Sequence, residues 1–111
     1  MKTYMFIIST FLSSIANAGE GNGKITGFIP YAKGNMEIIL IKVENHTQTP
    51  TCNTTLRFSM REDNPKYQGT KAAALAAFMA GTPVKMLGEN NCQAWGNAET
   101  IKALCLGNIP C

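Results

Sequence analysis

The chain of 111 residues has few of the side chains that carry catalysis or bind metals. It has one histidine, His46, and no two cysteines in Cys-x-x-Cys spacing. Zinc sites depend on such cysteine pairs and on histidines, so we expect no metal and no cofactor. The acidic residues are scattered, and no pair has the spacing of a general acid and base. We therefore expect no catalytic residues and no enzymatic activity. We also expect His46, in a polar segment, to be solvated.

A strong net charge and a second long apolar run are also missing. Ten Lys and Arg against seven Asp and Glu give +3, and removing residues 1–18 with Lys2 leaves +2. This charge is too small to favour a nucleic acid or an anionic membrane as partner. No later segment approaches the roughly 20 apolar residues of a membrane-spanning helix. We therefore expect no nucleic-acid binding and no membrane insertion.

Residues 1–18 have the parts of a secretion signal. Met1-Lys2 is positive, residues 4–15 are mostly apolar, and Ala16-Asn17-Ala18 is a small-x-small cleavage site. The alternative, a transmembrane anchor, needs a longer apolar run. We expect cleavage after Ala18, which leaves residues 19–111 as a single domain that is secreted to the periplasm or the extracellular space.

Four cysteines follow this signal: Cys52, Cys92, Cys105 and Cys111. An even number in a short exported chain predicts two disulfides, with three connectivities open. We favour Cys52–Cys92 and Cys105–Cys111. In the chain-entropy account the first bond is worth roughly 4 kcal/mol and the second roughly 2.4 kcal/mol.

The patterning predicts a mainly β domain with one helix. Strands are expected over 24–31, 36–43, 54–60, 83–87 and 100–106, and a helix over 71–80. Five short strands with a helix between the third and fourth are typical of a five-stranded OB-fold barrel. The alternative is an unspecialised α+β sandwich.

Two of these strands have informative faces. Segment 36–43 is apolar on both faces, so we expect it to be covered on both. Segment 54–60 alternates, which predicts one buried face and one polar face. The expected buried side chains are Leu56, Phe58 and Met60, and the expected polar ones are Thr55, Arg57 and Ser59.

The predicted helix begins after Thr70 as N-cap and ends at Gly81. Residues 72–80 are all apolar, so it lacks the polar face of an ordinary surface helix. We expect its large side chains to plug one end of the barrel: Leu75, Phe78 and Met79. The remaining alanine faces would then meet water or a neighbouring subunit.

Two segments carry a resemblance to a known family. They are Asn22-Gly23-Lys24-Ile25-Thr26-Gly27-Phe28-Ile29 and Ala76-Ala77-Phe78-Met79-Ala80-Gly81-Thr82-Pro83-Val84-Lys85-Met86. The chain resembles the B subunits of one-A, five-B bacterial toxins of the subtilase-cytotoxin, typhoid-toxin and pertussis-like type. It is shorter than those subunits and places its cysteines differently.

This resemblance implies a homopentamer of oligosaccharide-binding barrels. Such a ring docks on sialylated or galactosylated host cell-surface glycans and delivers a catalytic A subunit. The family's sialic-acid site includes a serine at the first strand, where Thr26 retains a hydroxyl. Asn22 lies where the subtilase type has an aspartate.

The residues themselves suggest further sugar contacts. Trp95 follows Cys92 in a loop rich in Asn and Gln, and an aromatic platform with planar polar groups suits a pyranose. Tyr31 and Arg57 are additional candidates, and Arg57 suits a sialic-acid carboxylate. In the alternative interpretation Trp95 plugs the barrel and Arg57 forms an intersubunit ion pair with Glu37 or Glu99.

Two functions thus remain open. The first is the secreted glycan-binding subunit. The second is a stand-alone secreted interaction protein, such as an inhibitor or a surface accessory, on the same barrel.

Overall fold

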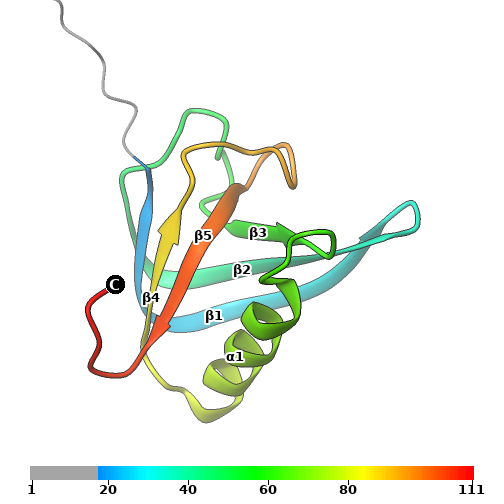
Figure 1. Cartoon of the computed structure of the whole chain (residues 1–111). Helices are drawn as coiled ribbons and strands as arrows, with labels where there is room; N and C mark the ends of the chain where they lie inside the picture. The colour runs from blue at the N-terminus through cyan, green and yellow to red at the C-terminus, as the bar shows by residue number, and fades with distance from the viewer. Residues whose placement is uncertain (1–17) are drawn as a thin grey trace, which may run out of the picture.

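The computed structural model describes residues 18–111, which form a mainly β fold with one helix (Figure 1). The predicted signal peptide lies outside the described residues, except for Ala18. The elements are β1 (Glu20–Lys33), β2 (Met36–Thr47), β3 (Phe58–Arg61), α1 (Tyr67–Ala80), β4 (Val84–Gly88) and β5 (Glu99–Leu106). The predicted order of three strands, a helix and two strands is confirmed.

The five strands form one sheet that closes on itself in the order β1-β2-β3-β5-β4. Closure occurs because β1 is long enough to pair with two strands. Its first residues, Glu20–Gly23, pair with β4, while nearly its whole length pairs with β2. All strand pairs are antiparallel except β3 with β5, which is parallel.

Strand β2 is covered on both faces, as its sequence predicts. Ile39, Ile41 and Val43 belong to the central core inside the ring, together with Phe58 and Met60 of β3. Ile38 and Leu40 point to the other face and form a second cluster with Ala98, packed by Met36 and Trp95. The outer face of β2 is therefore also buried here, under the residues of this second cluster.

The β1–β2 hairpin projects beyond the closed part of the sheet, toward the right in Figure 1. It turns at Gly34, whose φ of 62° is left-handed and suits a glycine. Both strands are longer than predicted: β1 already pairs with β2 and β4 at Glu20, and β2 continues to pair with it as far as Thr47.

Strand β3 is shorter than predicted and begins at Phe58. Leu56 was expected to point into the core with Phe58 and Met60, but it is exposed and has a left-handed φ of 53°. The side chain of Asn53 accepts a hydrogen bond from the Arg57 backbone N–H at 3.2 Å, which fixes a turn in place of a strand. Ser59, expected outside, is buried.

Helix α1 starts about one turn earlier than predicted, at Tyr67. Its N-cap is Lys66, without a side-chain cap, so the prediction of Thr70 as N-cap is wrong. Its predicted end is confirmed, since Gly81 is the C-cap in a left-handed conformation with φ 65°.

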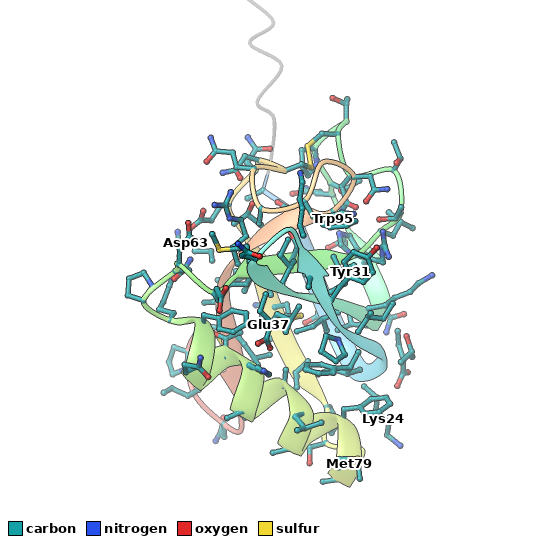
Figure 2. The ribbon with its side chains drawn as sticks, turned by 90° about the vertical axis from the view of Figure 1, so that its right-hand side faces the viewer. Lys24, Tyr31, Glu37, Asp63, Met79 and Trp95 are labelled. Atoms are coloured by element: carbon teal, nitrogen blue, oxygen red, sulfur yellow. A yellow bond between two sulfur atoms is a disulfide. The ribbon has the colours of Figure 1, made fainter. Side chains whose placement is uncertain are left out.

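The prediction that the large helix side chains plug the core is also wrong. Tyr67, Ala74 and Ala77 are the buried residues of α1. Leu75, Phe78 and Met79 are 45%, 39% and 76% exposed, and Figure 2 shows Met79 pointing away from the sheet. Alanines on the inner side allow the helix to lie close to β1 and β5, and the rotation this requires turns the larger side chains outward. We call these three residues the helix face.

Both predicted disulfides are confirmed. Cys52–Cys92 joins the loop before β3 to the loop between β4 and β5, with Cα atoms 6.1 Å apart. Cys105–Cys111 ties the C-terminal tail to β5, with Cα atoms 6.0 Å apart. Two disulfides indicate an oxidising environment, extracellular or periplasmic.

Candidate functional site

The loop between β4 and β5 lies over the outer face of the β1–β2 hairpin through Trp95. The indole packs on the second cluster, beside Ile38 and Leu40, and does not plug the central core. The ring of Tyr31 meets it edge-on, with centroids 5.2 Å apart and planes at 88°. The Lys33 ammonium lies 5.9 Å from the indole centroid. Figure 2 shows Tyr31 and Trp95 on the same side of the molecule.

A pocket of about 390 Å³ opens beside this aromatic pair. We call it the hairpin-tip pocket, and it is lined by Lys33, Asn35, Met36, Ile38 and Arg61. Met36 and Ile38 also belong to the cluster under Trp95, so the pocket has apolar walls. Its other lining groups are two cations and one amide.

Arg61 is positioned by the start of the loop after β3. Its Nη2 donates to Asp63 Oδ2 at 3.0 Å, and the two side chains are both partly exposed. Within residues 18–111, the buried Nε of Arg61 has no hydrogen-bond partner. The guanidinium has five N–H donors and uses one of them on Asp63, so its terminal nitrogens retain donor capacity beside the pocket.

Arg57 forms hydrogen bonds that fix the loop carrying Trp95. Its Nε donates to Thr55 Oγ1 at 3.0 Å and its Nη2 to Asn97 Oδ1 at 3.1 Å. Thr55 in turn donates to the Asn97 carbonyl at 2.6 Å. Arg57 thus holds the loop that carries Trp95.

Within the single chain described, over residues 18–111, Arg57 forms no ion pair, and an intersubunit pair with Glu37 or Glu99 stays a prediction. Glu37 pairs with Lys71 of α1. The hydrogen bond from Lys71 holds the pKa of the Glu37 carboxyl below its usual value. Glu99 is buried and accepts hydrogen bonds from backbone N–H groups.

The two residues carried over from the toxin resemblance lie elsewhere on β1. Thr26 is exposed and donates to the Lys42 carbonyl at 3.4 Å. At the rise of an extended strand, five residues separate Thr26 from Tyr31 by roughly 16 Å. Asn22 is farther along, opposite Asn45 of β2 and Lys85 of β4. The structure therefore brings together Tyr31 and Trp95, links Arg57 to them through Asn97, and leaves Thr26 and Asn22 apart.

None of the five residues that line the pocket was predicted as a site residue, including its three polar ones, Lys33, Asn35 and Arg61. Lys33 and Asn35 flank Gly34, and a Gly-Asn pair signals only a turn. Arg61 is one of several charges in a loop. The sequence did contain one signal for this pocket: polar residues flank the hairpin turn next to the apolar start of β2. That signal could not be read as a site, because Trp95, which packs there, comes from a distant segment.

His46 is not solvated as expected, because β2 continues to Thr47 and carries it into the sheet. Its imidazole stacks on Phe58, with centroids 4.7 Å apart. Burial lowers the pKa of His46, and the nearby Glu99 carboxylate partly opposes this. In the part of the chain described, no three His, Cys, Asp or Glu residues gather as metal ligands.

Comparisons with known proteins give no family for this chain. No protein-family profile matches the sequence, and no curated protein is significantly similar to it. Over residues 18–111, no helix has the length and apolar character to cross a membrane.

Proposed function

We propose that this protein is a secreted glycan-binding subunit that takes an acidic sugar in the hairpin-tip pocket. The observation that carries the proposal is the position of Trp95 and Tyr31 beside apolar walls that bear Lys33 and Arg61. A pyranose offers an apolar C–H face to an aromatic ring and hydroxyls to polar groups. Two cations at one pocket favour a carboxylate, and thus sialylated over galactosylated glycans.

An OB-fold for residues 19–111 is part of this proposal. It is supported by the closed strand order β1-β2-β3-β5-β4 and by α1 between β3 and β4. That fold presents ligand sites on its outer surface and its loops, which agrees with a pocket between a hairpin and the β4–β5 loop.

We further propose that the chain assembles as a homopentamer that delivers an A subunit. The support is the helix face, which exposes Leu75, Phe78 and Met79 without a polar residue between them. An apolar patch of this kind on a small domain marks an interaction surface. Packing of α1 against a neighbouring copy would cover it.

The glycan proposal is tested on a glycan array, followed by calorimetric titration of the best ligand. Tyr31→Ala and Lys33→Gln should each weaken binding at least about tenfold, which corresponds to roughly 1.4 kcal/mol. Tyr31 is half exposed, so its truncation leaves the core intact. The matched control is Lys42→Gln, an exposed lysine on β2 outside the pocket.

Thr26→Ala separates this pocket from the site implied by the toxin resemblance. Binding lost in Thr26→Ala but retained in Tyr31→Ala and Lys33→Gln would move the site to the middle of β1, around Thr26. Absence of binding to any glycan would refute the proposed function and favour the stand-alone interaction protein.

Assembly is tested by native mass spectrometry and light scattering of the secreted chain. A ring should dissociate when Phe78→Ser and Met79→Ser are combined, whereas Lys66→Ser on the N-terminal side of α1 should leave it assembled. A wild-type monomer at all concentrations would exclude the pentamer. Co-purification with an exported enzyme tests the A subunit.

A further inference from the structure

Glu99 is a fully buried carboxylate at the start of β5, with 0% of its surface exposed. Its Oε2 accepts hydrogen bonds from the backbone N–H of Gly19 at 2.9 Å and of Asn90 at 3.0 Å. Its Oε1 is buried and has no hydrogen-bond partner in residues 18–111. A buried carboxylate is costly unless a cation or a full set of donors compensates it.

Among residues 18–111, no side chain supplies that cation. In the described part of the chain, the ion pairs are Arg61–Asp63 and Lys71–Glu37, and neither involves Glu99. His46 is close enough to the carboxylate for the charge of Glu99 to act on it, but it makes no hydrogen bond to Glu99. Burial also lowers the pKa of His46, which favours the neutral ring.

The backbone nitrogen of Gly19 is already in the place that a cation would take. Gly19 is buried, whereas Ala18 before it is exposed. A side chain at Gly19 would collide with Glu99 Oε1 and with the carbonyl of Gln48, so residue 19 has to be a glycine. The sequence predicts cleavage by a signal peptidase between these same two residues.

We propose that the mature chain begins at Gly19 and that its new α-ammonium forms a buried ion pair with Glu99. The amide of Gly19 in the uncut chain has one N–H and serves one carboxylate oxygen. Hydrolysis of the Ala18–Gly19 bond releases the Ala18 carboxylate and leaves an amine that takes up a proton at neutral pH. The ammonium has three donors and one positive charge, so it can also serve Oε1.

This ion pair would couple processing to closure of the sheet. Gly19 immediately precedes the β1 segment that pairs with β4, and Glu99 begins β5. Gly88, at the end of β4, also packs directly against the Glu99 carboxylate. Three strands thus meet at the cleaved end: Figure 1 shows the start of β1 beside β4, with β5 on the other side of β4. The inference depends on the predicted cleavage and is independent of the proposed glycan function.

The first experiment is the intact mass of the secreted chain, which should start at Gly19. The second compares the melting temperatures of two folded chains, one beginning at Gly19 and one that retains Ala18. Ala18 is exposed, so retaining it changes the packing little. It moves the α-ammonium one residue away from the position beside Glu99. We expect the Gly19-first chain to melt at least about 4 °C higher.

Glu99→Gln should abolish this difference between the two chains, because the amide retains the shape without the charge. If Glu99→Gln does not fold, acetylation of the Gly19-first chain provides the test, since it restores a neutral amide and should lower the melting temperature equally. The pKa of the α-amine, followed by NMR of a chain that carries a ¹³C label at the Gly19 Cα, should lie above its usual value of about 8. A mature chain that starts elsewhere, equal melting temperatures, or an unshifted amine would overturn the proposal.

Discussion

The imidazole of His46 stacks on the ring of Phe58, with an angle of 20° between their planes. This places a titratable ring of β2 against the central core, with both ring nitrogens buried and without hydrogen-bond partners in residues 18–111.

The fold should therefore lose stability as the pH falls below about 6.5, the usual pKa of histidine. Burial lowers the pKa of His46 in the folded state, so the unfolded chain binds the proton first. The stability that the neutral His46 ring provides is fully present above the pKa of His46 in the unfolded chain. It is lost as the pH falls through the lower pKa of His46 in the folded chain. The slope should be a fraction of the roughly 1.4 kcal/mol per pH unit that one proton gives, because the Glu99 carboxylate partly opposes the effect of burial on the pKa of His46.

Urea unfolding between pH 5 and 8 measures this slope. His46→Gln should flatten it, whatever its effect on stability at pH 8. An unchanged slope in that variant would assign the pH dependence to other groups.

Gly88 should not tolerate a side chain, because a methyl group there would collide with the carboxyl group of Glu99. We expect Gly88→Ala to reduce the free energy of unfolding by about 1–3 kcal/mol, the usual range for overpacking. Gly96→Ala is the matched control, since nothing lies within 4 Å of its added methyl group. Equal stabilities of the two variants in urea unfolding would contradict the packing around Glu99.

The two disulfides should differ in their effects. Replacing Cys52 and Cys92 by serine removes the longer loop closure and should cost roughly 4 kcal/mol, against roughly 2.4 kcal/mol for Cys105 and Cys111. The first pair also anchors the Trp95 loop, so its loss should reduce the near-ultraviolet circular dichroism of Trp95. If the Cys105/Cys111 variant lost the Trp95 signal and the Cys52/Cys92 variant kept it, the Cys105–Cys111 bond would be the one that anchors the Trp95 loop.

Arg57→Lys should loosen the Trp95 loop while retaining the charge. Lysine cannot reproduce the two directed bonds to Thr55 and Asn97 that the guanidinium forms. Faster amide hydrogen exchange over residues 93–98, with little change in the central core, is the expected result. Protection equal to that of the wild type would mean that Arg57 does not position the loop.

The sequence predicts this fold well where local patterns decide the structure. The run of apolar residues in β2 predicted two covered faces, and Gly81 predicted the end of α1. It predicted poorly where distant segments decide. The outward turn of Phe78 depends on how closely alanines allow α1 to approach the sheet, and the left-handed Leu56 depends on the Asn53 side chain.

The same division applies to the candidate site. Trp95 and Tyr31 were predicted from their chemistry, but separately, because their contact requires the β4–β5 loop to fold back over a hairpin some 60 residues earlier in the sequence. Lys33 and Arg61 enter only with that geometry. The buried setting of His46 arises from the extension of β2, which a polar segment does not signal.

The closed strand order also has a consequence for how the chain reaches its native state. A chain made from its N-terminus can form the β1–β2 hairpin early, since those strands are neighbours in sequence. The ring has to wait for β4 and β5, whose partners in β1 and β3 lie far back in the chain. Contacts between such distant segments form slowly. Until then the inner face of β2 has no complete cover, so this interval is when the chain is most exposed to aggregation.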